Sequence, residues 1–207
     1  MKHLVPVLLS VLVLASCGKS DSSSSSGGSS TSGGGGGSAA TLGGATPQET
    51  FDKAKASGEK KDFGMFYDII HPDDHDMALF MFTFMAGMST MNDDAKKKEF
   101  EELGRKHGLV EKKDGPSLDL GDPAKMKEGV KEMFKDVKEK RAFFLELAAW
   151  TEKNSKQGEG WKVKPSAKLK SAKEEGEVAK CVIDTDGKES QATMKKHNGR
   201  WFMTMDK

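Results

Sequence analysis

Features that would assign this 207-residue chain to several large classes of protein are missing. Lys and Arg total 33 against 32 Asp and Glu, so the chain lacks the basic excess that nucleic-acid-binding proteins use to neutralise phosphates. Its two cysteines cannot build a disulfide framework. No apolar run reaches the roughly 18 residues of a membrane-spanning helix. We therefore expect neither a nucleic-acid partner, nor a disulfide scaffold, nor a spanning segment.

Signatures of catalysis and of cofactor binding are missing as well. The sequence contains no phosphate-binding loop, no zinc-ligand spacing and no Ser-His-Asp order. Cys181 could act as a nucleophile with His197 as its base, but the expected strand register separates the two residues by about 16 Å, too far for a hydrogen bond. We expect Cys181 to be a buried structural thiol. We predict no cofactor and no catalytic residue, and we favour binding over catalysis.

The first 17 residues read MKHLVPVLLSVLVLASC. Lys2 forms a charged start, an apolar stretch of about twelve residues follows, and small residues precede Cys17, which is the layout of a secretory signal peptide. Residues 14–17, Leu-Ala-Ser-Cys, resemble the lipobox of bacterial lipoproteins, in which the cysteine is lipidated and becomes the mature N-terminus. The resemblance implies a signal peptide over residues 1–16 and acyl chains on Cys17 that insert into a membrane. Because Gly18 rather than aspartate follows, it favours the outer membrane, facing the periplasm.

Residues 17–46 are predicted to be the lipidated cysteine and a disordered tether. Of the 29 residues after Cys17, ten are Ser and ten are Gly, a composition that buries too little apolar surface to offset the entropy of ordering it. A flexible coil of this length spans roughly 30 Å root-mean-square. Residues 47–207 then form one domain of ordinary size, with 31 basic and 31 acidic side chains.

The domain begins with sequence of helical periodicity. Residues 46–49, Thr-Pro-Gln-Glu, are a capping box that predicts a helix from residue 47. Apolar residues at helical spacing predict five further helices. These cover residues 63–70, residues 72 to about 91, a segment that ends at residue 108, residues 122 to about 137, and a segment from about 143 that ends before 158. About five or six helices are therefore expected.

The last forty residues change to strand periodicity. Asp186-Gly187 and Asn198-Gly199 are two-residue hairpin signals, and they pair residue 181 with 192 and residue 194 with 203. This register sorts apolar from polar side chains, except that Val178 and Phe202 fall on the polar face, either as a small exposed pair or beneath a loop. A first strand near 167–173 is joined by a three-residue loop ending in Gly176. The predicted fold is α+β, with N-terminal helices packed on one face of a C-terminal four-stranded antiparallel meander.

Two stretches carry a resemblance to a known superfamily. Residues 60–72, KKDFGMFYDIIHP, and residues 194–202, MKKHNGRWF, are similar to parts of small bacterial lipoproteins with domains of the nuclear transport factor 2-like superfamily, in which a helical half precedes a curved sheet. Residues 92–160 hold more helix than that fold needs. The resemblance implies a fold and no particular activity, because the superfamily includes both enzymes and ligand binders.

Five methionines fall on one stripe of the expected helix 72–91, namely Met77, Met81, Met85, Met88 and Met91. Core packing is the simplest interpretation, because Met fills irregular gaps and neighbouring Phe residues make this helix apolar nearly all round. Met81, Met85 and Met88 could instead line a groove for a ligand or partner. Thioethers are also soft ligands for Cu(I), so all five are weak candidates for a copper site.

Tyr67, His71 and His75 complete the candidates for a ligand pocket, which we expect between the apolar face of the sheet and the methionine-bearing helix. Residues 71–76, HPDDHD, could group metal donors, but their spacing matches no standard metal site, and acidic residues favour a helix start.

The favoured hypothesis is a membrane-tethered, non-catalytic binding module of the cell envelope, with an envelope protein or a small ligand as its partner. One alternative is an enzyme with a small apolar pocket that uses Tyr67, His71 or His75 as acid or base. Another is a Cu(I)-handling protein.

Overall fold

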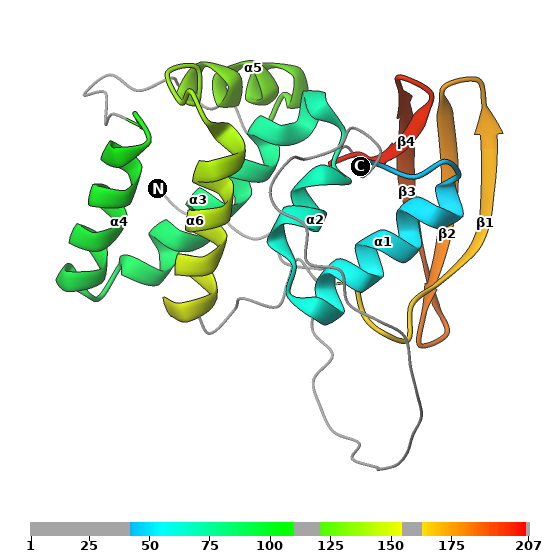
Figure 1. The fold of residues 1–207 in the computed structure, drawn as a ribbon, viewed down its shortest axis with the longest axis horizontal. Helices are drawn as coiled ribbons and strands as arrows, with labels where there is room; N and C mark the ends of the chain where they lie inside the picture. Colours follow the sequence, from blue (N-terminus) through cyan, green and yellow to red (C-terminus); the bar gives the residue numbers. More distant parts are fainter. Residues whose placement is uncertain (1–41, 110–120, 155–162, 206–207) are drawn as a thin grey trace, which may run out of the picture. The chain divides into compact units, whose positions relative to one another are not determined.

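The computed structural model describes residues 42–109, 121–154 and 163–205. The predicted signal peptide, Cys17 and the predicted tether up to residue 41 lie outside these ranges. Within them, six α-helices precede a four-stranded antiparallel sheet (Figure 1), which confirms the α+β prediction. In the same ranges, no helix combines the length and the apolar character needed to cross a membrane.

The helices begin after residues that cap them. Before α1 (Pro47–Lys60), the Thr46 side chain accepts a hydrogen bond from the Glu49 N–H. Before α2 (Phe63–Asp68), the Asp62 carboxylate accepts one from the Met65 N–H. Such side-chain caps satisfy backbone donors that the first helical turn leaves unpaired. The short 3-10 helix η2 (Pro72–Asp74) leads into α3 (His75–Thr90), and α4 (Asp94–Lys106), α5 (Pro123–Met133) and α6 (Lys140–Asn154) follow.

The strands β1 (Lys168–Glu175), β2 (Val178–Thr185), β3 (Lys188–His197) and β4 (Arg200–Met203) lie side by side in chain order. The predicted register is confirmed, because Cys181 lies opposite Ala192 and Met194 lies opposite Met203. Asp186 and Asn198 have positive φ, as the first position of a type I′ hairpin turn requires.

The connection between β1 and β2 differs from the prediction. Glu175 pairs directly with Val178, so the turn contains two residues instead of three. An irregularity between Leu169 and Ser171 shifts the register, and this bulge keeps Leu169 packed against the buried apolar side chains of the sheet. A three-residue loop without a bulge and a two-residue turn with a bulge both place Leu169 on the apolar face of the sheet. The alternation of apolar and polar residues in the sequence therefore could not distinguish these two arrangements.

Two groups of buried side chains stabilise the fold. The first joins Phe51 of α1 to the apolar face of the sheet, including Met194 and Trp201. The second joins α2, α3, α5 and α6, with Phe82 and Phe144 among its members. The helix α1 packs against β1 and β4, whereas α3 packs against α4, α5 and α6. The pocket expected between the sheet and the methionine-bearing helix α3 was therefore predicted in the wrong place.

The folded part of the chain begins before residue 47. The Gly44 N–H donates to the Trp201 carbonyl at 2.9 Å, and the Trp201 N–H donates to the Gly44 carbonyl at 2.7 Å. Gly43 has a φ of 58°, and an added Cβ there would lie 2.5 Å from the Trp201 oxygen. The end of the predicted tether, residues 42–46, therefore belongs to the fold. Composition alone concealed this, because glycine serves both flexible segments and close backbone approaches.

Candidate functional site: a corner pocket and an exposed methionine face

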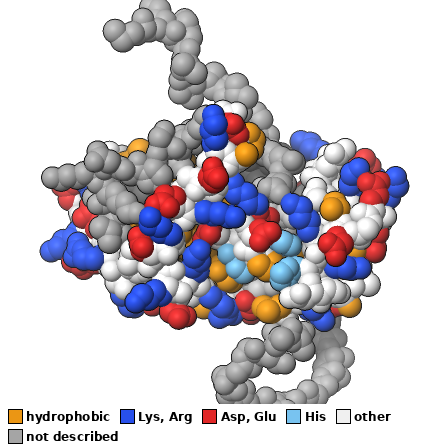
Figure 2. Space-filling model, turned by 90° about the horizontal axis from the view of Figure 1, so that it is seen from above, with side chains coloured by type: hydrophobic (Ala, Val, Ile, Leu, Met, Phe, Trp, Pro, Cys, Tyr) orange, Lys and Arg blue, Asp and Glu red, His pale blue; other side chains and the backbone are white. Residues whose placement is uncertain are grey.

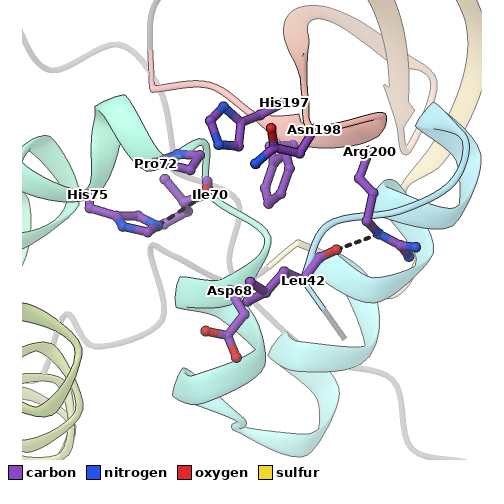
Figure 3. A pocket seen from close by; sticks show the side chains of 9 residues that line it. Leu42, Asp68, Ile70, Pro72, His75, His197, Asn198 and Arg200 are labelled. Carbon is purple, nitrogen blue, oxygen red and sulfur yellow. Dashed lines mark hydrogen bonds between the residues drawn. The ribbon is translucent and has the colours of Figure 1, made fainter. Parts of the chain in front are cut away.

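A cavity of about 270 Å³ lies where the β3–β4 turn meets the segment from the end of α2 to the start of α3 (Figure 3). Figure 2 shows imidazole and hydrophobic side chains gathered in one area of the surface. Apolar and polar side chains together line the cavity, namely Leu42, Asp68, Ile70, Pro72, His75, His197, Asn198, Arg200 and Phe202. An apolar wall with a few placed polar groups is typical of sites for small ligands, and the volume of this cavity lies just below their usual range of roughly 300–1,000 Å³.

Asp68, the last residue of α2, contributes a carboxylate that is already paired. Arg141 of α6 donates two hydrogen bonds of 2.9 Å to its two oxygens. The Asp68 carbonyl accepts a third, of 3.1 Å, from the Gly43 N–H. The pairing neutralises the carboxylate and fixes the end of α2 against both α6 and the segment that enters the fold.

His75, the first residue of α3, was predicted as a pocket residue and does line the cavity. Its ring stacks on Tyr67 with centroids 4.0 Å apart, and its Nε2 lies 3.2 Å from the Ile70 carbonyl. Burial lowers the pKa of His75, against the opposing effect of the backbone carbonyl of Ile70. The imidazole is therefore neutral at pH 7, and its position is fixed on both sides.

Tyr67 and His71 lie next to the cavity and do not line it. Tyr67 is buried, and burial raises the pKa of its phenol, so the phenol keeps its proton. The Nδ1 of His71 accepts a hydrogen bond from the Asp73 N–H, and the ring meets those of His197 and Phe202 at centroid distances of 5.5 and 6.1 Å. Burial lowers the pKa of His71. The basic nitrogen of this neutral ring is thus already engaged.

The β3–β4 turn and the strand ends beside it supply four of the cavity residues that the sequence did not predict, namely His197, Asn198, Arg200 and Phe202. Arg200 donates from Nε to the Leu42 carbonyl at 2.6 Å and from Nη2 to the Gly43 carbonyl at 3.3 Å. Phe202 is buried beside Gly43, which confirms the alternative that placed it beneath a loop. Its apolar side chain on an otherwise polar strand face was the available signal for this site.

The acidic residues around η2 are used within the fold. Asp74 is buried, and its carboxylate accepts hydrogen bonds from Lys127 Nζ at 2.6 Å and from the Met205 N–H at 3.2 Å. Lys140 Nζ lies 2.6 Å from Oδ1 of Asp76. Over the described ranges, no three His, Cys, Asp or Glu side chains come together in a group that could hold a metal ion.

Met81, Met88 and Met91 of the methionine stripe lie on the outer side of α3, so the core interpretation was wrong for these three. It is confirmed for Met77 and Met85, which pack against the helical group. Leu79 and Phe82 occupy the inward side. The exposed fractions of Met81, Phe84, Met88 and Met91 are 45%, 59%, 46% and 76%, and these four side chains are called the Met/Phe face below. Periodicity could not distinguish the two sides, because apolar residues occupy both.

The other methionines of α3 are partly buried, and the stripe is separate from the cavity. Met77 and Met85 pack against the helical group. Met81, Met85 and Met88, predicted as pocket residues, do not line the cavity. The Cu(I) hypothesis stays a prediction.

Cys181 is buried on the apolar face of the sheet, as predicted for a structural thiol. Burial raises its pKa, which keeps the sulfur protonated and unreactive.

Comparisons with family models, curated proteins and solved structures find no match for this chain. The resemblances to bacterial lipoproteins and to the nuclear transport factor 2-like superfamily therefore stay predictions.

Proposed function

We propose that this protein is a lipid-anchored component of the bacterial cell envelope that works by binding, with the corner cavity as its ligand site. The anchor is Cys17, and the sequence of residues 14–17 supports it. The Ser/Gly-rich residues that follow would hold the domain near the membrane, at the outer membrane facing the periplasm.

The binding role rests on one observation, which is that polar groups at the cavity are already hydrogen-bonded to other parts of the protein. Asp68 is paired with Arg141, and Arg200 donates to the carbonyls of Leu42 and Gly43. These groups form a fixed polar edge around an apolar wall. A pre-formed edge of this kind orients a small ligand by shape and hydrogen bonding and needs no proton transfer.

One observation favours the enzyme alternative, because a neutral imidazole, His75, borders an open cavity. A general base, however, needs a nitrogen lone pair within hydrogen-bond reach of its substrate. The Nε2 of His75 faces the Ile70 carbonyl, and the Nδ1 of His71 accepts from the Asp73 N–H. The lone pair of His71 is therefore engaged within the fold, whereas the Nε2–H of neutral His75 donates to the Ile70 carbonyl and leaves the lone pair on Nδ1. His75 is thus the residue on which the enzyme alternative rests, and the paired state of the other polar groups favours binding.

The proposal can be tested by native mass spectrometry of the protein extracted from its own membrane in mild detergent. His197→Trp places a larger ring over the cavity, and Lys173→Trp on the exposed part of β1 is its matched control. We expect the wild type and Lys173→Trp to carry the same added non-lipid mass and His197→Trp to lack it. No added mass on the wild type, or the same mass on His197→Trp, would contradict a ligand site at this cavity.

A further inference from the structure

The Met/Phe face is an exposed apolar surface that lies outside the cavity. Among the described residues, the exposed large hydrophobic side chains are its four members and Leu42. Sixteen consecutive residues, 77–92, contain no Asp, Glu, Lys or Arg, whereas the outer side of a surface helix is normally charged or polar. Exposed apolar surface of this kind marks a site of contact with another protein or with a membrane.

Local packing explains why this face is turned outward. Leu79 and Phe82 pack inward with the small residues Ala78 and Ala86. The members of the Met/Phe face follow one another at intervals of three, four and three residues, so they lie on the same side of the helix. The face runs from Met81 to Met91, the residue that follows α3, over a length of about 15 Å; the whole helix measures about 24 Å.

The place where the preceding chain enters the fold points to the occupant of this face. Leu42, the first described residue, and His75, the first residue of α3, line the same cavity. The predicted tether therefore reaches the domain beside the N-terminal end of α3. Residues 18–41 as a flexible coil span about 27 Å, close to the length of the helix. A bilayer that holds Cys17 is thus within reach of the whole face.

We infer that the Met/Phe face docks on the lipid bilayer, with Phe84 and the neighbouring methionines among the headgroups and upper acyl chains. The inference rests on the proposed anchor at Cys17. Flexible thioether side chains adapt to a fluid partner, and an apolar helix side is the part of an interfacial helix that enters a membrane. The tether makes a weak contact effective, because it keeps the local lipid concentration high.

Docking on lipid can be tested independently of natural lipidation if a lipid is coupled chemically to Cys17. The mature chain, residues 17–207, is produced without lipid. Because Cys181 is buried, Cys17 can be coupled selectively to maleimide lipids in vesicles of phosphatidylethanolamine and phosphatidylglycerol. The reference sample is the same chain coupled to a soluble maleimide. Mass spectrometry of peptides then measures the rate at which hydrogen peroxide oxidises each methionine.

We expect oxidation of Met81, Met88 and Met91 to slow about fivefold on vesicles, which corresponds to four-fifths of the domains being docked. Met126 of α5, packed against the helical group, should be oxidised at an unchanged rate. Phe84→Asp should remove the protection, because a charge is costly to bury in the membrane interface, and the matched control Phe84→Leu should keep it.

Two results would overturn the inference. Unchanged rates on vesicles, or protection that persists in Phe84→Asp, would mean that the face does not contact lipid. Protection of the soluble sample that grows with protein concentration would assign the face to a second copy of the chain. Neither result depends on whether cells lipidate Cys17, which the mass of the natural protein measures separately.

Discussion

Gly44 offers a direct test of where the folded domain begins. A Cβ at this position would lie 2.5 Å from both the backbone nitrogen and the Oγ1 of buried Thr50. Gly44→Ala must therefore displace the segment from β4 and weaken its two backbone hydrogen bonds to Trp201. Two such bonds contribute about 1 kcal/mol each, and overpacking adds about 1 kcal/mol or more. The free energy of unfolding should fall by about 3 kcal/mol, which lowers Tm by about 6–12 °C in a domain of this size.

Circular dichroism during thermal and urea unfolding of the mature chain measures this difference. Gly36→Ala is the matched control, because Gly36 lies in the same Ser/Gly-rich stretch, within the predicted tether. Substitutions away from structured features change stability by no more than about 0.5 kcal/mol. If Gly44→Ala is as stable as Gly36→Ala, residues 42–46 do not contribute to the stability of the fold.

Three further predictions concern buried histidines, Asp74 and the methionines. Burial lowers the pKa of His71 and His75, so the unfolded chain binds protons at a higher pH than the folded chain. Urea titrations should therefore show the free energy of unfolding falling from pH 7 to 5, by at most about 1.4 kcal/mol per pH unit per histidine. The fall should be smaller in His75→Gln, and a free energy that does not change with pH would contradict the prediction. In the same assay, Asp74→Ala should lower the free energy of unfolding by about 2 kcal/mol, because it removes the buried carboxylate that accepts a hydrogen bond from the Met205 N–H. A free energy of unfolding equal to that of the wild type would contradict this contact. The double variant Met81→Leu/Met88→Leu should release the same heat as the wild type when Ag(I), a soft ion like Cu(I), is titrated in a calorimeter. Heat released by the wild type alone would favour the Cu(I) hypothesis.

The sheet was predictable from short-range signals. Asp186-Gly187 and Asn198-Gly199 define hairpins through backbone conformations that few other residues adopt, and the resulting register is confirmed. The β1 bulge was not predictable, because it compensates for a shorter turn without changing which side chains face inward.

The cavity could be predicted only in part. His75 was among the predicted pocket residues, but the other cavity residues come from residue 42, from residues 68–72 and from residues 197–202, and only the tertiary fold brings these segments together. The outward side of α3 was hidden for another reason, since hydrophobic periodicity carries no information where both sides of a helix are apolar. Gly43 and Gly44 were assigned to the tether because composition cannot separate glycines that a fold requires from those that it does not.

Lipid anchoring through Cys17 can be tested by the intact mass of the protein, isolated from the membrane fraction of bacteria that express the full 207-residue chain. We expect a chain that begins at Cys17 and carries the added mass of a diacylglycerol and a fatty acyl group. Cys17→Ser should keep its first 16 residues and carry no such mass. A mature chain that begins elsewhere, or one that begins at Cys17 without acyl groups, would contradict the lipid anchor on which the proposed function rests.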